Sequence, residues 1–209
     1  MNDPIKEQLL QLLKAIWESD DFRLLDTERT RALRLELLTR LLGGVMTDDE
    51  RAQLHGLPIG CRMREGAKIL SKENLICGEY VWIGENSVLD ASGGLEIGSH
   101  TSIGLSVYLW SHTSPLTNLT MQNLSGSPLI ERKRTKIGSG VFISGPSVIF
   151  PGVSIGNKVI VSPLSVVNKD IPDYSVVAGN PARVIKTISE EYIEEEKARV
   201  LSERSETSK

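Results

Sequence analysis

Residues 137–156 read IGSGVFISGPSVIFPGVSIG, and an aliphatic residue returns at every sixth position of this stretch. The same spacing continues beyond it to Val161 and Val167. It also occurs earlier, at Cys77, Ile83, Leu89 and Leu95 and, after a shift of two residues, at Ile97, Ile103 and Leu109. Six residues are enough for one short strand and one corner. The period therefore predicts a solenoid in which each coil buries its inward residues against the next.

Glycine often follows the aliphatic residue, where its freedom of backbone angle suits a corner. It does so at Gly78, Gly84, Gly98, Gly104, Gly138 and Gly156. Ordinary alternation of apolar and polar residues in a β-sandwich is the alternative interpretation. A strict spacing of six residues from Ile137 to Val167 favours the solenoid.

Bulk properties narrow the class of protein. The chain has 209 residues and a net charge of −3, which disfavours a nucleic-acid partner or a membrane-surface protein. No apolar run approaches the roughly 18 residues of a membrane span, so we expect no membrane insertion. The chain starts without a basic-then-apolar signal pattern, so we expect a cytoplasmic protein. Cys61 and Cys77 lie too close to the repeat to suggest a disulfide scaffold, and Cys77 occupies an inward position as a small hydrophobe.

The chain divides into three predicted regions. Residues 1–57 are expected to form a helical cap, with helices over 4–18 and 27–42 and a short third helix from Thr47, which a capping box with Glu50 would start. An oligomer contact or an acceptor-binding arm is the other interpretation of these helices. Residues 58–188 are expected to form the solenoid, with an irregular first coil at 58–76 and eighteen residues in each coil. A charged helix and tail should occupy 189–209.

Over residues 77–188, about half of the chain, the sequence resembles the hexapeptide-repeat acyltransferases of the left-handed parallel β-helix fold. The stretch 137–156 and the closing string VAGNPAR at 177–183 carry this resemblance, which is strongest to the sugar and polysaccharide O-acetyltransferases. It implies a mainly β fold, a homotrimer, and acetyl-CoA as the acyl donor. The left hand of the helix is implied by the resemblance alone and departs from the usual right-handed crossover.

The chain has three histidines, His55, His100 and His112, and histidine suits proton transfer near neutral pH. A lone histidine is more often structural than catalytic. The resemblance, however, implies a catalytic histidine just before an extended loop, and His112 stands there. It would act as general base toward the acceptor hydroxyl. We expect no covalent intermediate, because no Cys or Ser lies in a recognisable nucleophile motif. The resemblance also implies a carboxylate or amide on a neighbouring coil that supports the histidine and the acceptor, and Asp90 is the best candidate.

The resemblance also implies a coenzyme A groove between adjacent subunits. The positions that match it are Phe142, Ser144, Gly145, Ser162, Pro163, Asn168, Lys169, Arg183 and Lys186. Phe142 replaces the usual Trp, and Ser144 and Pro163 stand where Gly or Ala is commoner. Pro163 has no backbone N–H to donate to the cofactor.

A long segment without the repeat, about 113–136, is expected to form a loop insertion, because loops of this length are usually functional or disordered. It ends in the basic string ERKRTK at 131–136. Such a charge run is most often a solvated face. Contact with a coenzyme A phosphate or an acidic glycan is the alternative.

Other functions fit the sequence less well. A γ-class carbonic anhydrase shares the predicted solenoid but needs three zinc-binding histidines. No histidine follows His112 in this sequence, so no metal is expected. A nucleotidyltransferase would need a larger domain before the repeats, and serine acetyltransferases carry a longer helical region. A non-catalytic binding or structural module remains an alternative, as does N-acetylation of an amino sugar or serine-type acceptor. The resemblance therefore implies an O-acetyltransferase of polysaccharide biosynthesis that acts on a sugar, nucleotide-sugar or glycan precursor.

Overall fold

The computed structural model describes residues 8, 11–12, 15, 27–122 and 127–207. Most of the helix predicted over 4–18 lies outside these residues. The chain comprises two units, residues 1–42 and 43–209. Helix α2 (Glu28–Gly43), which lies in the first unit up to Leu42, confirms the helix predicted over 27–42.

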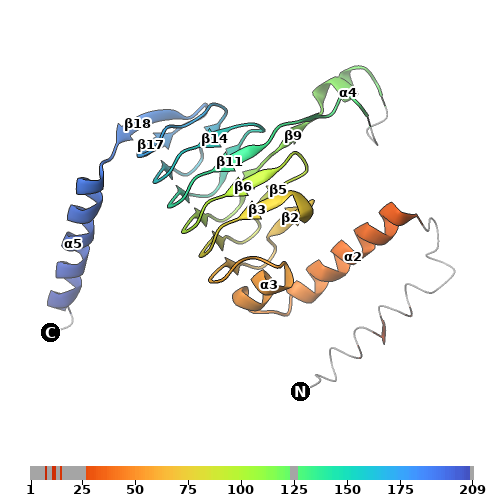
Figure 1. Cartoon of the computed structure of the whole chain (residues 1–209), viewed down its shortest axis with the longest axis horizontal. Helices are drawn as coiled ribbons and strands as arrows, with labels where there is room; N and C mark the ends of the chain where they lie inside the picture. The colour runs from red at the N-terminus through yellow and green to blue at the C-terminus, as the bar shows by residue number, and fades with distance from the viewer. Residues whose placement is uncertain (1–7, 9–10, 13–14, 16–26, 123–126, 208–209) are drawn as a thin grey trace. The chain divides into compact units, whose positions relative to one another are not determined.

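The second unit confirms the predicted solenoid, and its coils are stacked side by side in Figure 1. In the described part of the chain, the strands of these coils form three long sheets, parallel except for the antiparallel pair β17–β18. The seven-stranded sheet orders β1 (Arg62–Met63), β4 (Trp82–Ile83), β7 (Ser102–Ile103), β12 (Phe142–Ile143), β15 (Ile160–Val161), β17 (Ser175–Ala178) and β18 (Arg183–Thr187). The five-stranded sheet orders β2 (Lys68–Leu70), β5 (Val88–Asp90), β8 (Val107–Leu109), β13 (Ser147–Ile149) and β16 (Val166–Val167). The four-stranded sheet orders β3 (Leu75–Cys77), β6 (Leu95–Ile97), β11 (Thr135–Ile137) and β14 (Ser154–Ile155).

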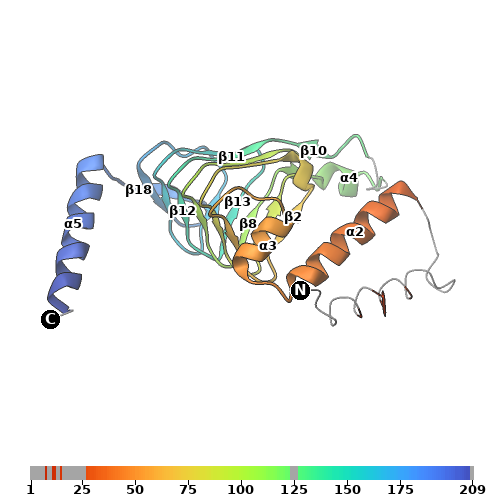
Figure 2. The same ribbon diagram turned by 60° about the horizontal axis from the view of Figure 1, so that its bottom comes forward.

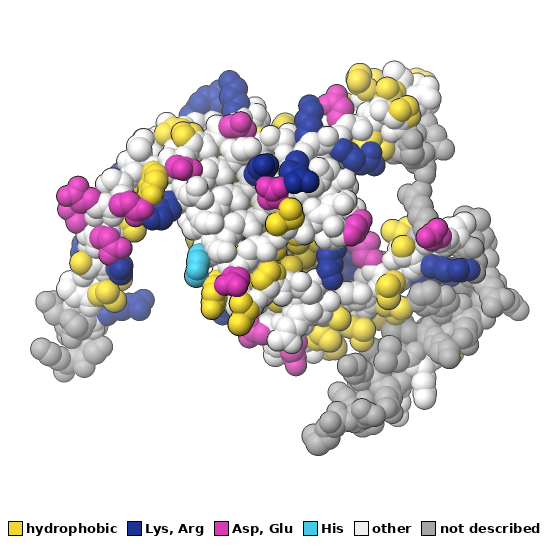
Figure 3. All heavy atoms as spheres, in the orientation of Figure 1, with side chains coloured by type: hydrophobic (Ala, Val, Ile, Leu, Met, Phe, Trp, Pro, Cys, Tyr) yellow, Lys and Arg dark blue, Asp and Glu magenta, His cyan; other side chains and the backbone are white. Residues whose placement is uncertain are grey.

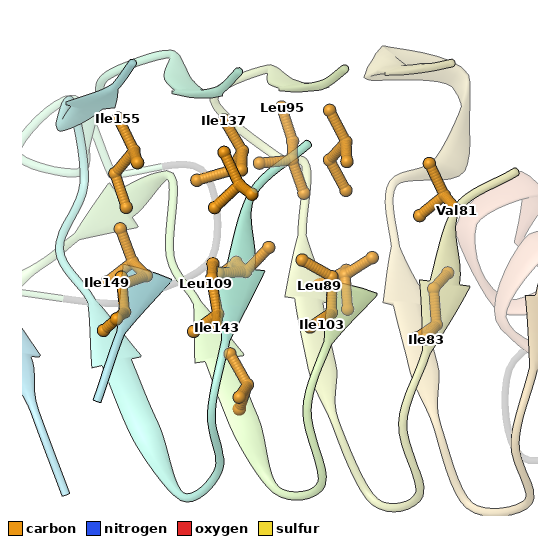
Figure 4. Packing of buried hydrophobic residues seen from close by; sticks show 14 of the residues in the cluster. Val81, Ile83, Leu89, Leu95, Ile103, Leu109, Ile137, Ile143, Ile149 and Ile155 are labelled. Carbon is orange, nitrogen blue, oxygen red and sulfur yellow. The ribbon is translucent and has the colours of Figure 1, made fainter. Parts of the chain in front are cut away.

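The core consists of the aliphatic residues of the six-residue period, whose side chains point into the interior of the coils (Figure 4). Parallel pairing in register places each inward residue against its equivalent in the next coil, as with Ile83, Ile103 and Ile143. All three are fully buried. Burying one such side chain contributes about 1.5–3 kcal/mol to the stability of the fold. Because the coils stack in register, each added coil extends one continuous core.

The prediction of eighteen residues per coil is wrong for most coils. Trp82 pairs with Arg62 and with Ser102, an advance of 20 residues each time, whereas Phe142 pairs with Ile160, an advance of 18. The variation lies at one corner, between the five-stranded and the four-stranded sheets. The inward residues that flank it are eight apart in the second coil (Leu89, Ile97), six apart in the fourth (Ile149, Ile155) and four apart in the fifth (Val167, Ile171). The long insertion leaves the solenoid at this same corner, which we call the loop corner.

The first coil is regular, although the sequence predicted an irregular one at 58–76. Its strands β1, β2 and β3 pair in register with β4, β5 and β6. The prediction failed because Met63 takes an inward position that aliphatic residues hold in other coils. Met63 and Ile69 are both buried.

The predicted third helix is confirmed as α3 (Asp48–Leu54), with Thr47 as N-cap and the capping box to Glu50. Ala52 of this helix belongs to the solenoid core. Beside it, the Arg51 side chain is 7 % exposed and donates to the carbonyl oxygens of Gly43 (2.7 Å), Met46 (2.6 Å) and Met63 (2.5 Å). This buried guanidinium therefore joins α3, the turn before it and the first coil.

The predicted C-terminal helix is confirmed as α5 (Glu190–Thr207). At its start, the Glu190 carboxylate accepts hydrogen bonds from Tyr174 and Lys158, which lie on successive coils. No helix among the described residues has the length and apolar character needed to cross a membrane.

Both cysteines are free thiols at the same corner of the first two coils. Their sulfur atoms lie 3.3 Å (Cys61) and 3.5 Å (Cys77) from one acceptor, the Gly78 carbonyl oxygen. Burial, reinforced by the neighbouring Cys61 thiol, raises the pKa of Cys77 to about 12. The thiolate is the reactive form, so the raised pKa makes the Cys77 thiol slow to react. Cys61 is buried, so reagents should also reach its thiol slowly in the folded protein.

We expect Ellman's reagent at mildly alkaline pH to modify the native protein at least about 10²-fold more slowly than the unfolded protein. The control is the same protein in concentrated guanidinium chloride, where both thiols should react. Rapid modification of two thiols in the native protein would contradict the buried placement.

Candidate active site

The structure brings His112 and Asp90 together at the loop corner. Asp90 ends β5, and His112 begins β9 (His112–Thr113) one coil further on. The His112 Nδ1 atom lies 2.7 Å from Asp90 Oδ2 and 2.9 Å from the hydroxyl oxygen of Ser92. The two residues are 22 positions apart in sequence, so the stacking of coils creates this pair.

The Asp90 carboxylate is held charged inside the protein. Its residue is fully buried, and burial alone would raise its pKa. Hydrogen bonds from the backbone N–H of Ser111 (2.9 Å), from Ser92 and from His112 outweigh burial and lower the pKa of Asp90 below its ordinary value. The Ser111 hydroxyl donates a further bond at 3.2 Å. Because the carboxylate is not exposed, it contacts the histidine rather than an acceptor.

This carboxylate fixes the tautomer of His112. An ionised carboxylate can only accept, so Nδ1 carries the hydrogen and Nε2 keeps its lone pair. The histidine side chain is 34 % exposed, and Trp110 lies beside its ring in an edge-on arrangement with centroids 6.1 Å apart. The pair therefore presents a hydrogen-bond acceptor, and a base, at the protein surface.

Glycine at position 93 allows the two coils to approach at this point. A Cβ atom on Gly93 would lie 2.0 Å from the carbonyl oxygen of Ser111. In the structure the Gly93 N–H instead donates to the Ser111 hydroxyl at 2.8 Å. The two extra residues of the second coil thus form a turn that carries Asp90 and Ser92 against the start of β9.

The loop insertion leaves this corner immediately after His112. A short helix α4 (Pro115–Leu119) follows, and the chain returns as β10 (Glu131–Arg132), which pairs antiparallel with β9. Figures 1 and 2 both show α4 projecting from the side of the solenoid. The N–H of Lys133 then donates to the Ser111 carbonyl oxygen at 2.8 Å. The β9–β10 ribbon is therefore anchored at its base beside His112.

Carboxylates balance most of the charge in the basic segment 131–136. Lys133 lies 2.8 Å from Glu131, and Arg134 and Lys136 both pair with Glu96. Figure 3 shows basic and acidic side chains next to one another on this face of the molecule. Among the described residues, Arg132 is the cation of this segment that makes no ion pair with a carboxylate.

The predicted cofactor residues lie away from His112 within one chain. The outward side of β12 carries Phe142. The second group, at the corner between the seven-stranded and five-stranded sheets, consists of Ser144, Gly145, Ser162 and Pro163. Strand β18 carries Arg183 and Lys186, and the loop corner beyond β16 carries Asn168 and Lys169. The five-stranded sheet separates the second group from His112. A groove of about 570 Å³ on the four-stranded sheet, lined by Glu96, Lys136, Ser154 and Asp170 among others, contains none of them.

The two remaining histidines stand in other surroundings. His55 is buried at the C-terminal end of α3, and the His100 ring stacks on Tyr80 with centroids 5.0 Å apart. The described residues hold no cluster of three or more His, Cys, Asp or Glu side chains that would bind a metal ion.

Sequence reasoning missed Ser92, Ser111 and Trp110. The signal that could have found them is the shift of two residues between Leu95 and Ile97, which marks a longer corner one coil before His112. A polar residue in that corner lies beside the next coil, because coils stack in register.

No family model matches the chain. It is 31% identical over 138 residues to WcaF of Escherichia coli strain K12, a protein assigned as a colanic acid biosynthesis acetyltransferase, covering 64% of this chain and 71% of the relative. It is 27% identical over 146 residues to the galactoside O-acetyltransferase of the same strain, covering 59% of this chain and 72% of that one.

Solved structures give the same likeness. A hexapeptide-repeat containing acetyltransferase from Vibrio cholerae, complexed with acetyl coenzyme A, superposes with a TM-score of 0.61 at 26% identity, over 79% of this chain and 92% of that one. A maltose O-acetyltransferase from Clostridium difficile superposes with a TM-score of 0.58 at 27% identity, over 75% of this chain and 86% of that one.

Proposed function

Because the chain belongs to the hexapeptide-repeat acyltransferases of the left-handed β-helix fold, we propose that it transfers an acetyl group from acetyl-CoA to a hydroxyl of a sugar, nucleotide-sugar or glycan precursor. The observation that carries the proposal is the Asp90–His112 pair, where a buried carboxylate orients a partly exposed imidazole at the loop corner. The compartment we propose is the cytoplasm.

In this proposal His112 is the general base. Its Nε2 atom accepts the proton of the acceptor hydroxyl as the hydroxyl oxygen attacks the thioester carbonyl carbon. The bond from that oxygen to the acetyl carbon forms, the carbon–sulfur bond breaks, and the proton passes from Nε2 to the departing sulfur. Transfer is direct, with no acetyl group held on the protein. Asp90 is a positioning residue that keeps Nδ1 protonated and stabilises the imidazolium while it exists.

We also propose that the site is completed in a homotrimer. His112 and most of the proposed coenzyme A residues occupy different corners of one prism, so a neighbouring copy would supply the missing side. The outward Phe142 and Ile160 of the seven-stranded sheet support this arrangement, because they are 49 % and 38 % exposed in the single chain. Phe142, Ser144, Gly145, Ser162, Pro163, Asn168, Lys169, Arg183 and Lys186 are the proposed coenzyme A contacts.

The test is a calorimetric titration with acetyl-CoA, followed by an acceptor screen that measures release of coenzyme A. We expect saturable binding by the wild type and by His112→Ala, and turnover by the wild type with a sugar acceptor. Alkaline hydroxylamine should remove the acetyl group from the product, because esters are cleaved and amides are not. Absence of acetyl-CoA binding would favour a structural module, and a resistant product would show N-acetylation.

A further inference from the structure

Arg132 stands directly opposite His112 on the β9–β10 ribbon. The two residues are register partners, as are Thr113 and Glu131 beyond them. The bond from Lys133 N–H to the Ser111 carbonyl marks the adjacent position as hydrogen-bonded, which makes 112 and 132 a non-hydrogen-bonded pair. In such pairs the Cα atoms are only about 4.5 Å apart and both side chains project from the same face.

Alternation along β10 separates the charges of the basic segment. Successive side chains of a strand point to opposite faces, so Glu131 and Lys133 share the face away from His112, where they pair with each other at 2.8 Å. Arg132 projects from the histidine's face. It is exposed, and no carboxylate among the described residues lies within ion-pair distance of it.

The nearby carboxylate cannot neutralise Arg132. Asp90 is fully buried, and its oxygens already accept bonds from Ser92, Ser111 and His112. The face of the ribbon that holds the proposed base therefore also holds an unneutralised guanidinium. A planar guanidinium with five donors matches carboxylate and phosphate groups in two-point hydrogen bonding.

The geometry points to Arg132 as a specificity-determining residue that binds an anionic group of the acceptor, so that acceptors with a carboxylate or phosphate are preferred to neutral sugars. This inference rests on the proposed function. The acceptor would be held at two points, its anionic group at Arg132 and its hydroxyl at Nε2 of His112. Opposed side chains begin about 5 Å apart, so the anionic group belongs to the same sugar unit as the hydroxyl or to an adjoining one.

Two pairs of acceptors test the effect of the anionic group. One pair tests a carboxylate, and the other tests a phosphate. p-Nitrophenyl β-glucuronide and p-nitrophenyl β-xyloside carry the same ring hydroxyls and differ in the carboxylate. Glucose 1-phosphate and methyl glucoside differ in the phosphate. The values of kcat/KM for all four are measured by release of coenzyme A from acetyl-CoA, with wild type, Arg132→Gln, Arg132→Lys and Lys133→Gln.

We expect the wild type to prefer the anionic member of at least one pair. The pair that shows the preference tells whether the bound group is a carboxylate or a phosphate. Arg132→Gln should lower this preference by about 10-fold to 100-fold, the size of a lost charge-assisted hydrogen bond. Arg132→Lys should retain part of the preference, because it keeps the charge but loses the planar fork. Lys133→Gln is the matched control: it removes the same charge from the other face and should leave the preference unchanged.

Three results would overturn the inference: equal kcat/KM within both pairs for the wild type, an equal fall for both members in Arg132→Gln, or an equal fall in preference for Lys133→Gln. If no member is turned over, the same pairs are titrated against the protein loaded with coenzyme A, and absence of preferential binding of the anionic members overturns it. Failure of the proposed function shows differently, as absence of acetyl-CoA binding by the wild type.

Discussion

Replacing His112 with alanine is expected to lower kcat for acetyl transfer by about 10²-fold to 10⁴-fold, the usual contribution of a general base. The reason is that no other described histidine faces the loop corner, since His55 caps α3 and His100 stacks on Tyr80. Binding of acetyl-CoA should persist, because the proposed cofactor contacts lie on other coils. Initial rates at saturating substrates, with calorimetry of acetyl-CoA, measure both quantities.

The matched control is His100→Ala, which removes the same side chain from a different corner of the solenoid. It should leave kcat within roughly threefold of the wild-type value, as is usual for a residue outside the reaction. A His112→Ala enzyme that also stays within this range would remove His112 from the mechanism. Loss of acetyl-CoA binding in the same variant would instead place the histidine in the donor site.

Replacing Arg51 with methionine is expected to lower the free energy of unfolding by about 3–5 kcal/mol, because buried carbonyl oxygens lose a charged donor that nothing replaces. The affected acceptors are the carbonyls of Gly43, Met46 and Met63, which belong to the segment 43–46 before α3 and to the first coil. Urea denaturation measures the change.

Arg64→Met provides the control. Both Arg51 and Arg64 pair with Asp48 at 3.4 Å, but the Arg64 side chain is 47 % exposed. Exposed ion pairs contribute at most about 1 kcal/mol, so this variant should differ little from the wild type. Stability in a solenoid is a sum of neighbour contacts, so hydrogen exchange in Arg51→Met should rise first in β1 to β3 and least in β12 and β15. Equal loss in the two variants would contradict the role assigned to Arg51.

The repeat was readable from the sequence because every coil must bury inward aliphatic side chains at the same spacing. Ile137, Ile143 and Ile149 each end a strand that buries one aliphatic side chain, and this requirement recurs every six residues. The capping box of α3 is equally local, since Thr47 and Glu50 meet within one helical turn. The sequence analysis did not identify Met63 as an inward residue, because methionine lies outside the aliphatic pattern although it fills the same position.

Asp90 was expected from the family resemblance, but the other partners in the site could not be read from the period of the sequence. Asp90, Ser92 and Arg132 reach His112 only after coils of unequal length have stacked and a long loop has folded back. The length of each corner sets which residues of one coil lie beside the next. A period counted along the chain does not contain this information, so the expectation of eighteen residues per coil was wrong for the coils that build the site.

The solenoid and its inward residues follow from the amino-acid sequence, because hydrophobic burial repeated at a fixed interval leaves one arrangement that satisfies every unit. The position of His112 before the loop is also visible in the sequence. The folded chain was needed to show that Asp90 is buried beside the imidazole, that Cys61 and Cys77 share one carbonyl, and that Arg132 shares a face with His112. These arrangements bring together residues that are far apart in sequence, and they depend on register between segments rather than on the local preference of either one.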